Sequence, residues 1–453
     1  MTHEAETLHT SGAAAPGAGA GDSTGTIGAK LQACAERIRT ATGDERLASM
    51  FLACMRNTLD TTLWREADGS TFVITGDIPA MWLRDSSAQM RAFLPLVEAE
   101  GPLFDIVAGL VRRQFAFLNH DPYANAFNRE PNGASYDPHD ACDDPWIWER
   151  KYEIDSLAFP VQLAHQLWLR SGRTEFFTAD VHRGLAAIVA QWRTEQDHRG
   201  QSPYRFERQT DLPSETLADG GLGSPVAVTG MTWAGFRPSD DSCVYGYNIP
   251  ANHFAHIALG YIAQIAAEVY DDEALAASAQ SLAAEIAAGI AAHGVVDHPD
   301  FGQIYAYEVD GLGNTLLMDD ANMPSLLSLP LTSAVSAADP LYLATRRFVL
   351  SPANPHFHAG TEAAGVGSPH TPPGYIWPIA LAVQGLTTSD RAEQWRLLEM
   401  LRDTDGGTGF MHEGFDPNDP ARFTRPWFSW ANSMFCELLL RYSGLDGTAA
   451  QAS

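Results

Sequence analysis

The sequence has few basic residues and no long apolar run, and both shortages exclude classes of function. Only 29 of its 453 residues are Lys or Arg, against 56 Asp or Glu, which gives a net charge of −27. Nucleic-acid binding depends on basic side chains that neutralise phosphates, so we expect no nucleic-acid partner and no anionic membrane surface. No run of about 18 apolar residues occurs, so we expect no membrane-spanning helix. Solubility explains the excess of acidic residues more simply than a property of the substrate does.

Cysteines are few and widely spaced. None of the five forms a Cys-x-x-Cys pair, so the sequence predicts neither a zinc knuckle nor a disulfide framework. Residues 1–30 contain no basic stretch followed by an apolar core, and so do not resemble a secretory signal. We therefore expect reduced thiols in a cytoplasmic protein. Ala, Gly, Ser and Thr dominate residues 1–30, which indicates a disordered tail.

The motifs of α/β enzymes are also missing. No strand–helix alternation is visible, and no dinucleotide fingerprint, phosphate-binding loop or Gly-x-Ser-x-Gly follows a strand. Apolar residues instead recur every fourth position, as at Ile257, Tyr261 and Ile265, which is typical of helices. A short lead-in helix over 31–40 and twelve further helices are predicted, near 45–64, 85–97, 102–119, 154–171, 176–194, 250–270, 273–293, 319–329, 338–350, 376–387, 389–404 and 428–443.

The connections between these helices alternate between short and long. Links such as 270–273 and 386–389 span only a few residues, which makes antiparallel helix pairs. Five others are long and rich in Gly, Pro, Asp, His and aromatic residues: 121–153, 195–250, 296–318, 351–375 and 405–427. Long loops in a compact domain usually have a function. The pattern predicts an α/α toroid of two helical rings, with the long loops around a cleft and a hairpin cue at Asp310-Gly311.

The first dense polar stretch is Thr75–Met90, which reads TGDIPAMWLRDSSAQM. It joins a strand-like run at 71–74 to a helix and holds Trp82, Arg84 and Asp85. Two interpretations are open at this point. Asp85 or Ser86 closes the start of the helix as an N-cap, or the polar side chains of the loop face a cavity.

A second stretch, 231–252, contains the adjacent acids Asp240 and Asp241 among several aromatic residues. Two neighbouring acids in extended chain face opposite ways, so we expect one to face a cleft and the other to pair with Arg237. Aromatic surroundings disfavour the charged form of a carboxyl group and would raise its pKa into the range of a general acid. The alternative is that both acids only mark the entry to the helix that starts near Pro250.

A third stretch, 409–415, places Glu413 next to His412 in the loop that precedes the last helix. A zinc-protease motif would need a second histidine at position 416, where the chain has an aspartate, so that chemistry is excluded. His356 and His358 are candidate metal ligands, but no complete ligand set accompanies them, and we expect no metal cofactor.

Together the loops describe a cleft rich in carboxylates, amides and aromatic rings. Aromatic faces stack on sugar rings, and carboxylates or amides bind hydroxyl groups, so a carbohydrate is the substrate that fits. Glycoside hydrolysis requires two carboxyl groups on either side of the bond that breaks. Asp240 and Glu413, on different long loops, meet that requirement.

Four blocks of the sequence resemble glycoside hydrolase family 125, a family of bacterial and fungal exo-α-1,6-mannosidases. The blocks are TGDIPAMWLRDSSAQM, GMTWAGFRPSDDSCVYGYNIPAN, SPHTPPGYIWPIAL and GFMHEGFDPNDPARFTRPWFSWANSMF. The resemblance runs from about residue 30 to 445. It implies one (α/α)6 barrel over 31–445, metal-independent hydrolysis with inversion, no cofactor, and a mannose-containing oligosaccharide as the partner. Residues 446–453 are expected to be a flexible end.

The resemblance also implies roles for individual residues. Asp240, in the Arg-Pro-Ser-Asp-Asp block, would be the general acid, and Glu413 the general base that activates water. Enzymes of this type have a serine after that glutamate, where this chain has Gly414. The residues expected to bind the terminal mannose are Trp82, Arg84, Asp85, Asp241, Tyr245, Asn248 and His370.

Two other functions are compatible with the residues alone. A sugar epimerase on the same toroid would use paired histidines, for which His356 and His358 are the candidates. A carbohydrate-binding protein would not orient Asp240 and Glu413 toward a cleft. A lyase acting on uronic acids is disfavoured, because it would need a basic cleft.

Overall fold

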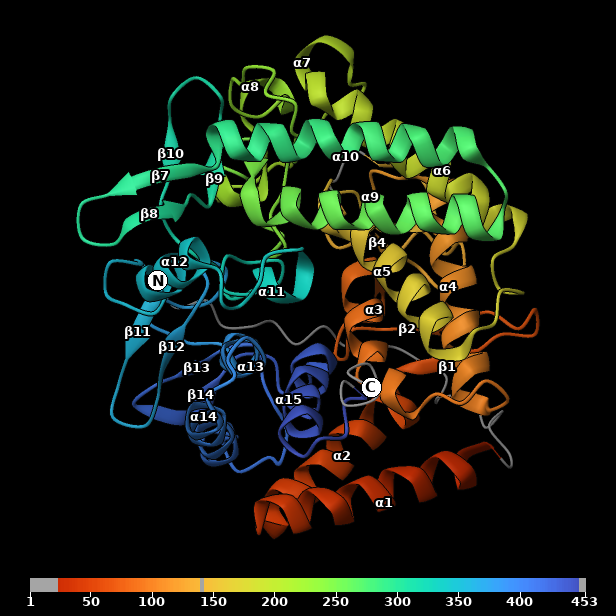
Figure 1. The fold of residues 1–453 in the computed structure, drawn as a ribbon, viewed down its shortest axis with the longest axis vertical. Helices are drawn as coiled ribbons and strands as arrows, with labels where there is room; N and C mark the ends of the chain where they lie inside the picture. The colour runs from red at the N-terminus through yellow and green to blue at the C-terminus, as the bar shows by residue number, and fades with distance from the viewer. Residues whose placement is uncertain (1–22, 139–141, 448–453) are drawn as a thin grey trace.

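Two concentric sets of helices make up the fold, in a computed structural model that describes residues 23–138 and 142–447 (Figure 1). The inner helices are α3 (Leu83–Arg91), α5 (Ile154–Ser171), α9 (Ile249–Val269), α11 (Leu329–Thr332), α13 (Pro378–Leu386) and α15 (Ser429–Tyr442). Neighbours in this set pack in turn: α13 on α15, α15 on α3, α3 on α5, α5 on α9, and α9 on α11. This arrangement confirms the predicted α/α toroid.

The outer helices are α2 (Glu45–Thr61), α4 (Pro102–His120), α6 (Ala179–Thr194), α10 (Glu273–His293), α12 (Pro340–Val349) and α14 (Arg391–Asp403). Burial separates the two rings. Every residue of the inner helix α13 is buried, whereas the outer helix α14 buries only Gln394, Leu397, Leu398 and Leu401. These four positions recur at helical spacing, so α14 is amphipathic and packs with one face.

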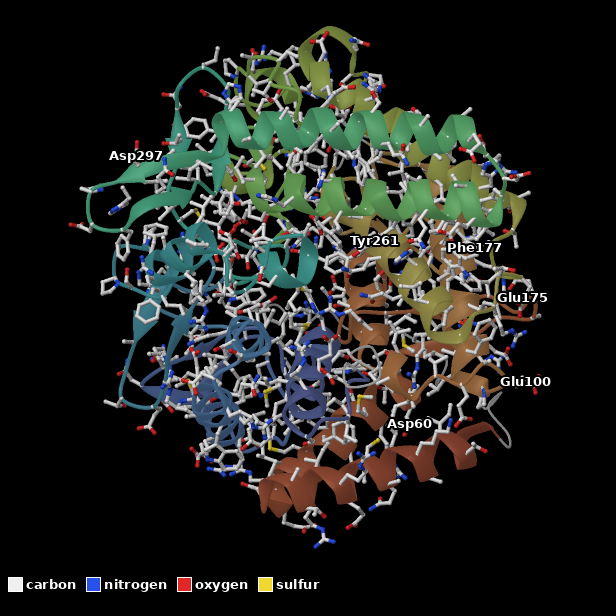
Figure 2. All side chains as sticks on the ribbon, in the orientation of Figure 1. Asp60, Glu100, Glu175, Phe177, Tyr261 and Asp297 are labelled. Atoms are coloured by element: carbon white, nitrogen blue, oxygen red, sulfur yellow. The ribbon has the colours of Figure 1, made fainter. Side chains whose placement is uncertain are left out.

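Aromatic contacts join the helices around the ring. Tyr261 of α9 stacks on His165 of α5 with ring centroids 4.2 Å apart, and Phe177 meets Tyr270 edge-on at 6.1 Å (Figure 2). Offset and edge-on ring pairs add about 0.5–1.5 kcal/mol each beyond the area that they bury. These contacts fix α5 and the start of α6 against the end of α9.

By length and composition alone, α10 is apolar enough to cross a membrane. Its many alanines satisfy that criterion, although no single run of the sequence is apolar throughout. In the structure α10 lies along α9 (Figure 1), and Leu275, Leu282 and Ile286 are buried. The packing assigns α10 to the outer ring of the toroid.

The strands are short and pair antiparallel between the helices. They are β1 (Leu63–Arg65) with β2 (Thr71–Val73), β3 (Met81–Trp82) with β4 (Ala126–Phe127) and β5 (Ile147–Glu149), β6 (Tyr247–Asn248) with β9 (Glu308–Val309) and β10 (Thr315–Leu316), β7 (Val295–His298) with β8 (Gly302–Tyr305), β11 (Phe357–Ala359) with β12 (Ala364–Val366), and β13 (Phe415–Asp416) with β14 (Asp419–Phe423). The hairpin cue at Asp310-Gly311 is confirmed, because the Asp310 carboxylate accepts the N–H groups of Leu312 and Asn314 between β9 and β10.

The structure departs from the sequence predictions most clearly at the lead-in helix and at the segment 319–329. The lead-in helix α1 begins at Ser23 and runs to Thr42, so the predicted tail does not extend to residue 30. Residues 1–22 and 448–453 lie outside the described residues. The prediction of a helix over 319–329 was wrong. Asp319 accepts backbone N–H groups from Leu326 and Leu327, at 2.8 and 3.0 Å, and so stabilises a compact loop. This loop is followed by the short helix α11. The long connection 195–250 carries two further helical turns, α7 (His198–Gln201) and α8 (Ala218–Gly221).

Candidate active site

A cavity of about 200 Å³ lies where several inner helices begin. Trp82 and Glu153 directly precede α3 and α5, and Trp377 and Phe428 directly precede α13 and α15. The cavity is lined by Thr75, Ile78, Trp82, Arg84, Asp85, Tyr136, Glu149, Lys151, Glu215, Pro238, Ser239, Asp240, Asn322, His370, Trp377, Glu413, Arg425, Phe428 and Trp430. Both carboxylates proposed as acid and base from the sequence therefore face one cavity.

A tight turn presents Asp240 to this cavity. The N–H of Asp240 donates to the Arg237 carbonyl at 2.9 Å, and the N–H of Arg237 donates to the Asp241 carbonyl at 2.8 Å. Pro238 suits the first central position of such a turn, and aspartate tolerates the left-handed backbone that Asp240 adopts, with φ of 66°. A non-glycine residue held in this region stores strain, and such strain gathers at functional sites.

Cations and not aromatic rings set the pKa of Asp240, which corrects the sequence-based expectation. Arg84 Nη2 donates to Asp240 Oδ1 at 2.8 Å, and the Asp240 side chain is 20% exposed. Burial raises the pKa of Asp240, but the Arg84 guanidinium, a hydrogen bond with Glu153 and the Lys151 ammonium outweigh it. The pKa of Asp240 is thus held well below its usual range, where a raised pKa was predicted.

Arg84 is the centre of a buried ion cluster. Its side chain is only 3% exposed, and Nη1 donates to Glu153 at 2.7 Å and to Asp155 at 3.1 Å. Burial raises the pKa of Glu153 well above its ordinary value and that of Asp155 to about 6, although Arg84 opposes both shifts. The guanidinium therefore holds α3, the start of α5 and the turn of Asp240 together.

Asp85 is not the helix cap that was one interpretation of the sequence. Helix α3 begins at Leu83, with Trp82 at the N-cap position and no side-chain cap. The Asp85 carboxylate instead accepts a hydrogen bond from Thr75 Oγ at 2.7 Å and lies 3.5 Å from Arg84. Burial raises its pKa, against the pull of Arg84. Trp82, Arg84 and Asp85 all line the cavity, as the second interpretation required.

Asp241 pairs with His370. The distance between Asp241 Oδ1 and His370 Nδ1 is 3.3 Å, and Asp241 is buried while His370 lines the cavity. Burial lowers the pKa of His370, but Asp241, Glu413 and Asp240 together raise it to about 10. His370 therefore carries a positive charge at neutral pH.

Glu413 reaches the cavity from a segment that is paired along its backbone. The Glu413 N–H donates to the Thr424 carbonyl, and the Gly414 N–H donates to Thr424 Oγ at 3.0 Å. Arg425 Nη1 lies 3.7 Å from Glu413 Oε1, and the His370 cation also faces this carboxylate.

His412 serves the fold and does not enter the cavity. Its ring is buried, stacks on Phe423 at 3.6 Å, and contacts the carbonyls of Arg425 and Asp405. The buried His412 ring thus anchors the segment from which Glu413 enters the cavity.

Arg237 does not pair with either aspartate, which corrects a second expectation. Its Nε donates to Glu308 Oε1 at 2.5 Å, and the other oxygen of Glu308 accepts the N–H groups of Val244 and Tyr245. Glu308 on β9 thus anchors both ends of the segment that carries the two aspartates.

Two residues expected to bind the sugar lie outside the residues that line the cavity. Asn248 is fully buried and caps helix α9, because its Oδ1 accepts the Ala251 N–H at 2.9 Å. Tyr245 is held through its backbone by Glu308. In the structure these contacts hold the chain next to the cavity. This role also replaces the interpretation of Asp240 and Asp241 as helix-entry acids, since Asn248 does the capping.

Sequence reasoning missed one wall of the cavity. Lys151 Nζ donates to Glu215 at 2.8 Å, Arg208 bridges Glu149 and Glu215 at 2.9 and 2.6 Å, and the Tyr136 ring covers the Arg208 guanidinium at 5.0 Å. The stretch 146–155 has the same signal as Thr75–Met90, with alternating acids, bases and aromatic residues before a helix. The similarity of 146–155 to Thr75–Met90 is therefore the sequence signal that could have predicted this wall of the cavity.

The described residues offer one potential set of metal ligands. Glu215, Asp241 and His370 place one ligand atom each within 4.8 Å of one another. Lys151 and Arg208 already pair with Glu215, and Asp241 pairs with His370, so cations of the protein itself occupy this set. His356 and His358, the candidates for an epimerase, do not line the cavity.

Comparison with known proteins shows which family the chain belongs to. The family model of the metal-independent α-mannosidases of glycoside hydrolase family 125 matches residues 44–440. The meiotically up-regulated gene 157 protein of Schizosaccharomyces pombe is 42% identical over 428 residues, which cover 89% of this chain and 84% of that protein.

Solved structures agree. A Streptococcus pneumoniae protein, from a family of metal-independent α-mannosidases and solved as a non-productive substrate complex with α-1,6-mannobiose, is 48% identical with a TM-score of 0.90. That match covers 93% of this chain and 99% of the other. A structure described as a wild-type glycosidase is 17% identical with a TM-score of 0.50, covers 88% of this chain and 97% of its own, and supports the fold alone.

Proposed function

Because the chain belongs to the metal-independent α-mannosidases of glycoside hydrolase family 125, we propose that it is an inverting, exo-acting α-1,6-mannosidase. Asp240 acts as the general acid and Glu413 as the general base. The observation that carries this proposal is that both carboxylates, from two loops far apart in the sequence, line one small cavity.

The step requires one proton donor and one proton acceptor on either side of the anomeric carbon. Asp240 protonates the glycosidic oxygen as the bond to the leaving sugar breaks. Glu413 takes a proton from water, whose oxygen attacks the opposite face of the anomeric carbon and inverts its configuration. Asp240 suits the acid better than Asp241 does, since Asp241 is buried against His370.

The lining residues support recognition of a single terminal sugar. Trp82, Trp430 and Phe428 supply ring faces, and Asp85, Arg84 and Asn322 supply groups that bind hydroxyls. At about 200 Å³ the cavity is smaller than the pockets of drug-sized ligands, about 300–1,000 Å³, which favours one sugar ring over an extended chain. The mannobiose complex of the 48% identical relative supports the α-1,6 linkage.

An α-1,6-mannotriose that carries a fluorescent label at its reducing end tests the exo mode. We expect free mannose and labelled mannobiose to appear first, with labelled mannose formed only later. Release of intact, unlabelled mannobiose would show internal cleavage, and the absence of any hydrolysis would contradict the mannosidase proposal itself.

A further inference from the structure

Glu153 binds the same guanidinium, that of Arg84, as the acid Asp240. It is 1% exposed and does not line the cavity, whereas Asp240 does. Its Oε2 accepts hydrogen bonds from Arg84 Nη1 at 2.7 Å and from Ser156 Oγ at 2.8 Å. No donor of the described residues reaches its Oε1, which is buried.

The carboxyl groups of Glu153 and Asp240 share one guanidinium. Arg84 Nη1 lies 2.7 Å from Glu153 and Arg84 Nη2 lies 2.8 Å from Asp240, which brings the two carboxyl groups to the same end of the Arg84 side chain. An ionised carboxylate only accepts hydrogen bonds, so two carboxyl groups form one only when one of them carries a proton. A direct hydrogen bond between two such neighbours therefore requires that one proton stays in the pair.

The charges around the pair lead to the same conclusion. The single positive charge of Arg84 is in contact with four carboxylates, those of Asp85, Glu153, Asp155 and Asp240. Like charges that share a buried site cannot all ionise. The titratable and charged groups that act electrostatically on Glu153 are Arg84, Asp155, Asp240 and Cys243. Those that act on Asp240 are Arg84, Glu153, Lys151, His370, Asp85, Asp155 and Tyr136.

We propose that Glu153 holds the proton that Asp240 delivers to the glycosidic oxygen, which makes Glu153 a positioning residue of the reaction. The inference rests on the proposed function, and it removes a difficulty in it. Asp240 faces the substrate but is stabilised as an anion by Arg84 and Lys151, so alone it would lack the proton that an acid needs.

The proton sits on the more buried member of the pair in the resting site. Burial raises the pKa of Glu153, and the cations around Asp240 lower the pKa of Asp240. As the glycosidic bond breaks, its oxygen becomes more basic. Asp240 then gives a proton to that oxygen and receives the proton of Glu153 across their hydrogen bond.

The step balances. The bond between the anomeric carbon and the glycosidic oxygen breaks, and a bond to the water oxygen forms. The Glu153–Asp240 pair loses one proton to the leaving sugar, and Glu413 gains one from water. Release of the Glu413 proton to solvent and uptake of one proton by the pair restore the resting state.

A comparison of two substrates tests the role of Glu153. In α-1,6-mannobiose the leaving sugar must be protonated, whereas 2,4-dinitrophenyl α-mannoside releases a phenolate that needs no acid. General acid–base catalysis contributes about 10²–10⁴-fold. We expect Glu153→Gln to lower kcat on mannobiose by about 10²-fold, and to leave kcat on the aryl mannoside within about fivefold of the wild type.

The pH profile provides a readout that a purely structural role would not move. An amide at 153 can donate to Asp240 but has no proton to pass on, so Asp240 is protonated only at low pH. We expect the basic limb of kcat/KM on mannobiose to move to lower pH by at least about one unit in Glu153→Gln. An unmoved basic limb would overturn the proposal.

Asp155→Asn is the matched control, because Asp155 also pairs with Arg84. Loss of this charge disturbs the position of Arg84 and should lower activity on both substrates by similar factors. If Glu153→Gln likewise lowers both substrates equally, Glu153 only supports Arg84 and the inference fails.

A second variant, Glu153→Asp, tests the same role if Glu153→Gln does not fold. Glu153→Asp keeps the titratable group but withdraws it from Asp240 by one methylene, and we expect a smaller loss that is again confined to mannobiose. Equal losses on both substrates would overturn the proposal here too. A wild-type enzyme that does not hydrolyse mannobiose would contradict the proposed function; an active wild type with an active Glu153→Gln variant would contradict only this inference.

Discussion

At the scale of single residues, the site depends on pairs of neighbours whose side chains have different partners. His412 packs on Phe423 while Glu413 enters the cavity, and Asp241 pairs with His370 while Asp240 faces Arg84. In each pair one residue anchors the backbone and the other is free to meet the substrate. A functional carboxylate is thus held by its neighbour in the chain, and replacing it need not disturb the anchor.

Replacing Glu413 tests the base. Since His412 and Thr424 hold the segment, Glu413→Ala should fold normally and lower kcat on α-1,6-mannobiose by about 10³-fold, within the range of general-base catalysis. Circular dichroism and steady-state kinetics measure the two effects. Glu362→Ala is the control, because that glutamate is exposed on a loop away from the cavity and should keep wild-type turnover. Turnover of Glu413→Ala close to the wild type would rule out this base.

His370 predicts a pH dependence of stability. Its pKa in the folded protein is about 10, above the ordinary value of about 6.5, so the charged imidazole stabilises the fold. This stabilisation is complete below pH of about 6.5 and is lost as the pH rises toward 10. We expect the difference in free energy of unfolding between the wild type and His370→Gln to shrink over that window. Urea titrations of both proteins at each pH measure it, and a difference that grows with pH would contradict the assignment.

The site residues that the sequence predicted lie in dense local motifs, whereas the contacts that it did not predict join segments far apart in the chain. Asp240, Glu413, Trp82 and Arg84 stand in dense local motifs, so the chain itself draws attention to them. The contact of Glu153 with Asp240 joins segments far apart in the sequence. The pKa of Asp240 was predicted with the wrong direction for the same reason, since Arg84 and Lys151 approach it only in the folded chain.

At the scale of elements, the beginnings of the inner helices converge on the cavity. The N-terminal end of a helix carries about half a positive charge, which stabilises nearby anions. Asp85 lies in the first turn of α3 and Asp155 in that of α5. This placement helps to offset the many carboxylates buried here. The toroid thus supplies both the positions and part of the electrostatics of the site.

Two glycines of paired helices should respond in opposite ways to alanine. A Cβ on Gly289 of α10 would come within 2.7 Å of the Thr229 carbonyl, whereas one on Gly260 of α9 would meet nothing within 4 Å. We expect Gly289→Ala to lower the free energy of unfolding by about 1–3 kcal/mol through overpacking. Gly260→Ala should raise it by about 0.5–1 kcal/mol through helix propensity. Equal effects of the two substitutions in denaturant titrations would contradict the packing of α10 on the loop that contains Thr229.

Helix spacing and loop length were enough to predict most elements. The pairs α9–α10 and α13–α14 follow from apolar periodicity and short links, which are local properties. The segment 319–329 was predicted wrongly because a side chain, Asp319, satisfies the backbone N–H groups of Leu326 and Leu327. Apolar periodicity carries no information about such a loop.

At the scale of the whole molecule, acidic residues are spread over the outer surface. Asp60, Glu100, Glu175 and Asp297 are all exposed, and Glu100, Glu175 and Asp297 lie at the edges of the view in Figure 2. A net charge of −27 makes the folded state repel itself, and salt screens that repulsion. The substrate that we propose is neutral, so the surface charge gives it no long-range attraction.

Salt should therefore affect stability more than catalysis. Between about 0.01 and 0.15 M NaCl the Debye length falls from about 30 to about 8 Å. We expect the unfolding midpoint to rise, and kcat/KM for α-1,6-mannobiose to change by less than about twofold. Differential scanning fluorimetry and initial rates measure the two quantities. A steep fall of kcat/KM with salt would indicate a charged substrate instead.

The account as a whole depends on Asp240 and Glu413 acting on one bond from opposite sides. Proton NMR of the mannose released from α-1,6-mannobiose tests this directly, because the anomeric signal is read before mutarotation scrambles it. An inverting acid and base predict that β-mannose appears first and α-mannose grows in later. Initial release of α-mannose would show retention, and would contradict the roles assigned to Asp240 and Glu413.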